Sequence, residues 1–319
     1  MTEQAQAGTE VYELVSQLSD NMQSVVLGKP EVIRLCMVAL LAGEHILLED
    51  VPGVGKTLIG KTMARSVNGK FCRIQFTPDL LPGDITGTSV YRQTTGDFEF
   101  IKGPIFANVV LADEINRTTP RTQSALLEAM SDGQVSIDSD TYNLPQPFIV
   151  IATQNPFEFD VTYPLPESQL DRFLIRIAVG YPNREDEMQV LDDHRVGEPV
   201  DDLQPVLNCQ QIRTMQEAVR EVTVSDAIRH YLLDLVDITR HSEELHVGVS
   251  TRGALCLYRA AQALATVEGR DYVVPDDVKE LTLPVLCHRM FTKGYVHSGH
   301  REATESILRR ILDQVPVPK

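Results

Sequence analysis

The chain has 319 residues, of which 43% are hydrophobic and 23% charged, a composition that fits a folded protein of about two domains. These figures exclude a disordered, a collagen-like and a small disulfide-rich protein. Acidic residues outnumber basic ones by 45 to 29, and the resulting formal net charge of −16 is spread along the chain. Because this charge repels phosphate backbones at long range, we expect no nucleic-acid partner.

Three further sequence features bear on location. Five cysteines lie far apart and never in a CxxC pair, which predicts free thiols in a reducing compartment. The first ten residues, MTEQAQAGTE, lack the basic region and apolar run of a signal peptide. The longest apolar stretches, such as Met37–Ala42, are too short to cross a bilayer. We therefore expect a cytoplasmic protein without membrane insertion.

Hydrophobic periodicity predicts two helices and then an alternation of strands and helices. The helices cover about residues 10–27 and Pro30–Ala42. Helical patterns at Thr57–Ser66 and Thr122–Met130 lie between continuous apolar runs that are typical of buried parallel strands. Five such strands are expected, at His45–Leu48, Phe71–Phe76, Asn108–Ala112, Phe148–Thr153 and Phe173–Val179. This alternation predicts an α/β fold, with a parallel five-stranded sheet flanked by helices.

Two inserted segments and the last third of the chain depart from that alternation. Residues 91–100 and 134–144 each predict a β-hairpin, with turns near Thr95-Gly96 and Ser139-Asp140. After Pro182 the strand signals fade, and helical periodicity covers 184–195, 209–221, 225–242, 252–267, 276–288 and 302–314. We therefore expect an α/β core at 1–181 and a small all-helical domain at 182–319.

A glycine-rich loop, EDVPGVGKT at Glu49–Thr57, follows the first strand and opens a helix, which is the context of a P-loop. Glycines let consecutive N–H groups face one anion, and the helix N-terminus adds its positive dipole end. Lys56 would bridge the β- and γ-phosphates, and the Thr57 hydroxyl would ligate Mg²⁺. Asp50 stands where a first glycine is usual, so we expect its carboxylate to point away from the phosphates. The expected nucleotide-binding residues are Pro52, Gly53, Val54, Gly55, Lys56, Thr57 and Leu58, together with Asp113.

Polar residues follow two later strands, at the edge where the P-loop is expected. Asp113 and Glu114 end the third strand, and Asn155 follows the fourth. Ligands of an open parallel sheet bind at the carboxyl ends of its strands. Asp113 suits Mg²⁺ binding together with Thr57, Glu114 suits activation of a water, and the Asn155 amide suits orientation of that water. Because asparagine before proline is also a frequent turn device, that alternative stays open for Asn155.

Two arginines complete the candidate catalytic set of Glu114, Asn155, Arg172 and Arg252. Arg172 precedes the fifth strand, and Arg252 opens a helix of the second domain. An arginine from a neighbouring subunit, placed at a developing γ-phosphate charge, raises hydrolysis by orders of magnitude. Arg172 suits this part, and Arg252 suits contact with nucleotide across the domain cleft. A solvated surface arginine is the open alternative for both.

The ordered motifs resemble those of the AAA+ ATPases and, within them, the MoxR family. The resembling stretches include QFTPDLLPGDITG at 75–87, LADEINR at 111–117, ATQNP at 152–156, LPESQLDRF at 165–173 and VSTR at 249–252. The resemblance implies a P-loop core with a helical lid, bound ATP and Mg²⁺, and a ring oligomer, usually a hexamer, whose pore the two hairpins line. It also implies Walker A at Gly53, Gly55, Lys56 and Thr57, Walker B at Asp113 and Glu114, sensor 1 at Asn155, an arginine finger at Arg172 and sensor 2 at Arg252.

The resemblance therefore implies a MoxR-type AAA+ ATPase. In such a protein Mg²⁺-dependent ATP hydrolysis drives chaperone-like remodelling or maturation of a client, including insertion of a metal cofactor. The expected partners are further copies of this chain, a client and a protein with a von Willebrand A domain. That last partner would be a separate chain, because no DxSxS motif occurs here. A nucleotide-gated scaffold and the motor subunit of a metal chelatase stay open as alternatives.

Overall fold

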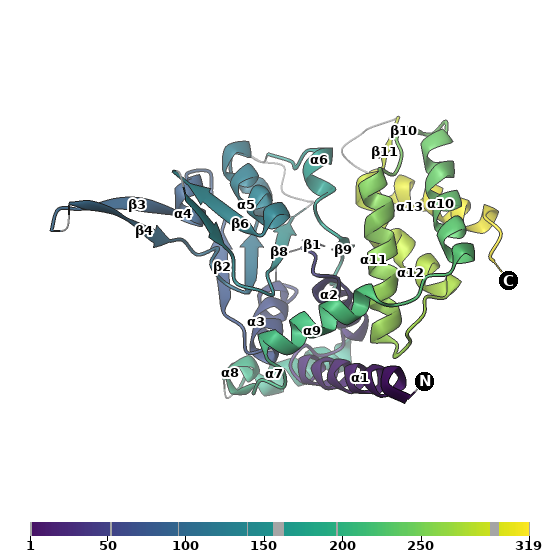
Figure 1. The fold of residues 1–319 in the computed structure, drawn as a ribbon, viewed down its shortest axis with the longest axis horizontal. Helices are drawn as coiled ribbons and strands as arrows, with labels where there is room; N and C mark the ends of the chain where they lie inside the picture. Colours follow the sequence, from purple (N-terminus) through teal and green to yellow (C-terminus); the bar gives the residue numbers. More distant parts are fainter. Residues whose placement is uncertain are drawn as a thin grey trace.

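The computed structural model describes residues 2–51, 53–94, 96–138, 140–155, 163–195, 197–293 and 300–318. A five-stranded parallel sheet organises the fold (Figure 1), with strands β1 (Ile46–Glu49), β2 (Phe71–Gln75), β5 (Val109–Asp113), β8 (Ile149–Gln154) and β9 (Ile175–Ile177). Their order is β2-β5-β8-β1-β9, and each neighbouring pair is parallel. The predicted strands are confirmed, although the last is shorter than Phe173–Val179. All five carboxyl ends therefore lie at one edge of the sheet.

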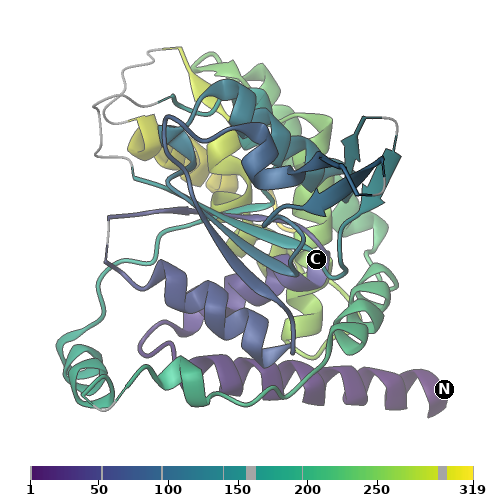
Figure 2. The same ribbon diagram turned by 90° about the vertical axis from the view of Figure 1, so that its left-hand side faces the viewer.

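Both faces of the sheet are buried, because successive side chains of a strand point to opposite faces. Val109 and Leu111 of β5 join one hydrophobic cluster, whereas Val110 and Ala112 join another on the opposite face. Figure 2 shows the sheet between these two layers. The first layer contains α1 (Thr2–Gln23), α2 (Pro30–Ala42) and α3 (Lys56–Ser66), and the second contains α4 (Pro82–Thr86) and α5 (Pro120–Asp132). Burial on both faces explains why the strands are continuous apolar runs.

Two β-hairpins are inserted into this core, as predicted. β3 (Gly87–Arg92) pairs with β4 (Asp97–Lys102), and β6 (Gln134–Ile137) pairs with β7 (Asp140–Asn143). The first hairpin is longer than the predicted 91–100 and projects well beyond the rest of the chain in Figure 1. It carries Tyr91 and Phe98, which are 52% and 73% exposed. Thr95 and Ser139, at the predicted turns, lie outside the described residues.

The chain after β9 is mainly helical, as predicted, with an unpredicted four-residue helix at Pro199–Asp202 and one addition of β-structure. Short elements η1 (Ile115–Arg117) and α6 (Glu167–Leu170) precede β9. The helices after it are α7 (Arg184–Asp193), α8 (Pro199–Asp202), α9 (Cys209–Arg220), α10 (Asp226–His241), α11 (Thr251–Val267), α12 (Pro275–Leu286), η2 (Cys287–Arg289) and α13 (His300–Gln314). The addition is an antiparallel pair, β10 (Leu245–Val247) with β11 (Phe291–Thr292), whose strands are too short to give a periodicity signal.

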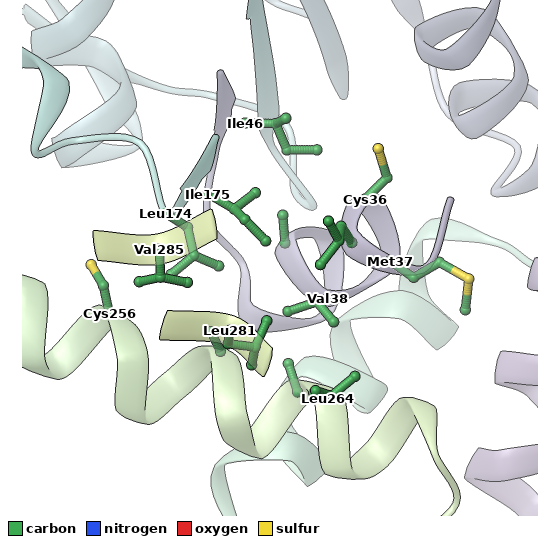
Figure 3. Packing of buried hydrophobic residues seen from close by; sticks show 14 of the residues in the cluster. Cys36, Met37, Val38, Ile46, Leu174, Ile175, Cys256, Leu264, Leu281 and Val285 are labelled. Carbon is green, nitrogen blue, oxygen red and sulfur yellow. The ribbon is translucent and has the colours of Figure 1, made fainter. Parts of the chain in front are cut away.

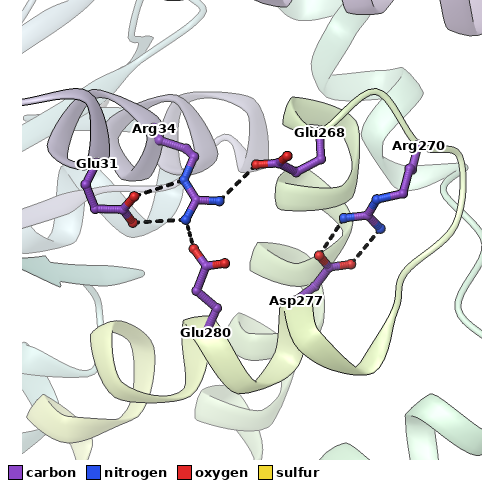
Figure 4. A network of polar contacts seen from close by, with 6 residues as sticks. All are labelled: Glu31, Arg34, Glu268, Arg270, Asp277 and Glu280. Atoms are coloured by element: carbon purple, nitrogen blue, oxygen red, sulfur yellow. Dashed lines mark hydrogen bonds and ion pairs between the residues drawn. The ribbon is translucent and has the colours of Figure 1, made fainter.

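The helices α11 and α12 pack directly on the α/β core. Val38 of α2, Ile175 of β9 and Leu281 of α12 belong to one buried cluster (Figure 3). Arg34 of α2 adds ion pairs across the same contact, to Glu268 at 2.9 Å and to Glu280 of α12 (Figure 4). α11 and α12 are therefore fixed against the side of the core that carries β9. Among the described helices, none combines the length and the apolar character that crossing a membrane requires.

Candidate active site

The predicted P-loop connects the carboxyl end of β1 to the N-terminus of α3. Gly53 and Gly55 have φ angles of 84° and 85°, in the left-handed region that favours glycine. A Cβ at either position would meet no atom within 4 Å, so the loop requires these glycines for its curl and not for lack of space. Gly55 is the N-cap of α3, and Lys56 and Thr57 form its first turn. Pro52 lies outside the described residues.

Lys56 and Asp50 make the hydrogen bonds that hold the start of this loop. The Lys56 ammonium donates a hydrogen bond of 2.7 Å to the Asp50 carbonyl oxygen. The Asp50 carboxylate accepts from the N–H of Val51 at 2.7 Å and from the N–H of Gly180, beyond β9, at 2.5 Å. The carboxylate is therefore oriented toward the β9 connection, in agreement with the expectation that it points away from the phosphates. It also ties the loop to the segment that leads to the C-terminal helices.

Asp113 and Glu114 lie at the same edge of the sheet, where β5 ends next to β8. Thr153 of β8 connects them, since its hydroxyl donates to Asp113 Oδ1 at 2.6 Å and accepts from the Glu114 N–H at 2.8 Å. Glu114 has a φ of 58°, an uncommon conformation for a residue other than glycine. Asn155 follows β8 and is buried. The Asp50 N–H donates to the Gln154 carbonyl at 3.3 Å, so the ends of β1 and β8 are adjacent.

Neighbouring polar side chains hold both acids, and sequence reasoning missed them. Arg73 of β2 donates to Asp113 Oδ2 through Nη2 at 2.5 Å and through Nε at 3.0 Å. Glu114 Oε2 accepts from Gln75 Nε2 at 2.8 Å and from Arg117 Nη1 at 2.9 Å. The sequence gives little indication of a role for Arg73 and Gln75, because polar residues are common at alternate positions of an edge strand. Only the pairing of Gln75 with Asp113 in the β2–β5 register reveals their role.

The two candidate arginines lie at the opposite edge of the sheet. The peptide N–H of Leu174 donates to the His45 carbonyl at 2.9 Å, which places the Arg172 segment at the amino end of β1. Arg172 Nη1 donates to the Leu127 carbonyl at 2.5 Å and to Ser131 Oγ at 2.7 Å, both on α5. Arg252 is exposed in the first turn of α11, and the N-cap of this helix, Ser250, donates to Asp171 Oδ2 at 3.2 Å. Burial lowers the pKa of His45, and the hydrogen bond with the Met130 carbonyl and the charge of Glu44 only partly oppose this shift.

The structure therefore divides the predicted catalytic set into two groups. Glu114 and Asn155 share the carboxyl edge with the P-loop and Asp113, whereas Arg172 and Arg252 share the amino edge. The strands between these edges have four to six residues in β1, β5 and β8, which corresponds to roughly 13–20 Å. An arginine side chain cannot cover that distance through the sheet. Neither arginine can therefore complete the phosphate site of its own chain in this arrangement.

The groups at the carboxyl edge fit a magnesium nucleotide. The loop offers backbone N–H groups, the N-terminus of an eleven-residue helix and one ammonium group, all suited to phosphates. The Thr57 hydroxyl and the Asp113 carboxylate are hard oxygen donors, which Mg²⁺ prefers. Val54 and Leu58 are partly buried against the main hydrophobic cluster, so their side chains anchor the loop. The edge can therefore bind a triphosphate and hold a carboxylate beside it.

Comparison with known proteins gives consistent findings. The family described as "ATPase family associated with various cellular activities (AAA)" matches residues 45–175, and the AAA lid domain matches residues 237–311. The chain is 46% identical to YeaC of Bacillus subtilis (strain 168), over 97% of this chain and 96% of that protein. It is 42% identical to Chaperone MoxR1 of Mycobacterium tuberculosis (strain ATCC 25618 / H37Rv), over 93% of this chain and 81% of the relative. A crystal structure of a proposed ATPase from Cytophaga hutchinsonii ATCC 33406 has a TM-score of 0.89 and 38% identity, and the match covers 98% of this chain and 97% of that one.

Proposed function

Because the chain belongs to the MoxR family of AAA+ ATPases and is an ATP hydrolase, we propose that it works as a ring-forming, Mg²⁺-dependent motor that remodels or matures a client protein. The observation that supports a ring assembly is that Arg172 and Arg252 lie at the sheet edge opposite the P-loop. In a closed ring of head-to-tail copies, the edge that lacks arginines in one subunit faces the edge that supplies them in the next. A hexamer is the expected ring.

Glu114 is the group that takes the proton of the attacking water. Its Oε2 accepts hydrogen bonds from Gln75 and Arg117, so these donors occupy an oxygen that would take the proton. Release of these two donors is therefore part of activation. Asn155 supplies an amide that orients the water and leaves the charge of Glu114 intact.

Binding of the triphosphate requires Lys56 to exchange the Asp50 carbonyl for phosphate oxygens. The N–H groups from Gly53 to Thr57 then bind the same anion from the helix N-terminus. Mg²⁺, when bound, would be held by Thr57 and Asp113 and would neutralise phosphate charge. Because Arg73 bonds Asp113 Oδ2 through two N–H groups, its positive charge would compete with Mg²⁺ for this carboxylate.

Subunit mixing tests the supply of arginines by a neighbour. A Lys56→Ala chain cannot bind nucleotide but keeps its arginines, and an Arg172→Ala chain keeps its P-loop but lacks the arginine. Each is expected to be inactive alone, and an equal mixture is expected to regain turnover at about one interface in four. A mixture of Lys56→Ala with Glu114→Gln is the control, because both defects lie at the same edge and no interface is complete. Failure of the first mixture to regain activity, with mixed rings present, would contradict the proposal.

The client role is supported by the name of the relative Chaperone MoxR1 and by the exposed aromatic pair on the β3–β4 hairpin. Tyr91 and Phe98 lie in contact with each other, with ring centroids 5.3 Å apart, and offer an apolar surface to a client. In this proposal, maturation of the client includes insertion of a metal cofactor. The chain acts in the cytoplasm, and a separate protein with a von Willebrand A domain is its expected partner.

Glu114→Gln tests the client role directly. The amide keeps nucleotide binding and loses the base, so the variant should hold its client and allow co-purification from the native cell. Lys56→Ala, which cannot bind nucleotide, is the matched control and should not retain the client. If Glu114→Gln supports full client maturation, hydrolysis is dispensable and the chain is a nucleotide-gated scaffold.

A further inference from the structure

A buried arginine in the C-terminal helical region fixes the backbone on both sides of Arg172. The side chain of Arg289, in η2, is only 1% exposed. Its Nε donates to Asp171 Oδ1 at 2.8 Å, and its Nη2 donates to the carbonyls of Phe173 at 2.5 Å and Asp171 at 3.4 Å. The neighbouring His288 also contacts the Phe173 carbonyl, at 2.9 Å through Nε2. The carbonyl groups of residues 171 and 173, on either side of residue 172, are thus bonded to η2.

The same network reaches the helix that carries Arg252. Asp171 Oδ2 accepts a hydrogen bond of 3.2 Å from the hydroxyl of Ser250, and Ser250 caps α11 by accepting from the Gly253 N–H at 3.0 Å. Gly253 also packs on Arg289, since a Cβ there would lie 3.0 Å from Arg289 Cδ. Asp171 therefore joins the Arg172 segment, η2 and the first turn of α11 at one point.

We propose that Arg289 is a positioning residue that holds Arg172 and Arg252 in one rigid arrangement, so that both arginines are presented together to the nucleotide of the neighbouring subunit. The inference rests on the proposed function, in which the arginines act across the subunit interface. The planar guanidinium makes several bonds in fixed directions, which a lysine ammonium cannot reproduce. Arg289→Lys keeps the buried charge, and it separates positioning from charge compensation.

The chain offers a matched control in the same helical region. Arg270 and Asp277 form a second bidentate arginine–aspartate pair, with Nη2 to Oδ1 at 2.6 Å and Nη1 to Oδ2 at 2.8 Å (Figure 4), although the Arg270 side chain is 22% exposed. Asp277 is 4% exposed. The hydrogen bonds of this pair join α12 to the turn after α11, away from Asp171 and the Arg172 segment. Arg270→Lys therefore disturbs an ion pair with a buried carboxylate, without disturbing the arginines of the interface.

The experiment uses the same subunit mixing, with the Arg172→Ala chain as the acceptor. Three donors are compared, all with Lys56→Ala so that their own sites are silent. The first has no further change, the second adds Arg270→Lys, and the third adds Arg289→Lys. Sedimentation velocity measures how much donor enters mixed rings. A displacement of about 1 Å in a catalytic group can cost roughly 100-fold in rate, so we expect the third donor to restore at least tenfold less turnover than the first two.

Arg289→Lys in an otherwise unchanged chain gives a second readout. Because the P-loop lies at the opposite edge, we expect a tenfold or greater loss of kcat with an unchanged affinity for an ATP analogue. If the Arg289→Lys donor restores as much turnover as the Arg270→Lys donor, the inference is overturned. If even the simple donor restores nothing, the proposed function fails first. If the Arg289→Lys donor does not enter mixed rings, an Asp171→Asn donor replaces it. A tenfold or greater loss of restored turnover with this donor supports the inference, and full restoration of turnover overturns it.

Discussion

Replacing Thr153 by valine should destabilise the chain more than replacing it by serine, although valine keeps the volume of the side chain. Thr153 is 1% exposed, and its hydroxyl bonds both Asp113 and the Glu114 N–H. Valine removes the two bonds and leaves a partly buried N–H without this acceptor, at a combined cost of about 3 kcal/mol. Serine keeps both bonds and loses one buried methyl group, at a cost of about 1 kcal/mol.

Urea unfolding followed by circular dichroism measures this difference, and steady-state phosphate release measures its effect on turnover. Glu114 has a φ of 58° and relies on the Thr153 hydroxyl for its N–H partner. We therefore expect Thr153→Val to lose turnover about tenfold or more, while Thr153→Ser stays closer to the parent chain. A valine variant that is as stable and as active as the serine variant would refute the role assigned to this hydroxyl.

Three further predictions follow from other contacts. Burial, with the charges of Arg289 and Arg176, lowers the pKa of His288 well below its ordinary value of 6.5. Folding therefore favours the neutral imidazole, so the free energy of unfolding is highest above about pH 6.5 and falls below it by up to about 1.4 kcal/mol per pH unit. His288→Gln should reduce this pH dependence of the free energy of unfolding, measured by urea unfolding between pH 7 and 5. Arg73→Gln should lower the Mg²⁺ concentration needed for half-maximal ATP-analogue binding by up to about fivefold, because it removes a competing half-exposed cation; an unchanged or higher requirement would contradict this. Phe98→Ser should leave unstimulated ATP turnover within about twofold and the melting temperature unchanged, because the ring is 73% exposed on a projecting hairpin.

The sequence was sufficient for the parts of the fold that depend on local pattern. The runs around Ile46, Val109 and Ile149 are apolar at every position because both faces of the sheet are covered, and short continuous runs of this kind are typical of buried parallel strands. The P-loop was predicted because glycines, lysine and threonine at fixed spacing between a strand and a helix are chemically specific. The strands β10 and β11 were missed because two or three residues carry no periodicity.

The contacts within the site could not be predicted in the same way, because they depend on strand order and register. Thr153 and Asp113 are 40 residues apart and meet only because β8 lies beside β5. The separation of Arg172 from the P-loop likewise follows from the parallel pairing of β9 with β1. Arg172 precedes β9 and lies at the amino edge, whereas the P-loop follows β1 and lies at the carboxyl edge. The sequence motifs suggest that Arg172 serves a neighbouring subunit, but only the strand order shows that it lies at the edge opposite the P-loop of its own chain.

The most direct measurement of the central claim is ATP turnover per chain as a function of chain concentration, with sedimentation velocity on the same samples. A site completed by a neighbour's arginines predicts turnover near zero where single chains dominate, and a rise that follows the assembled fraction. Constant turnover per chain across a range in which the protein sediments as single chains would contradict it, since one chain would then complete its own site.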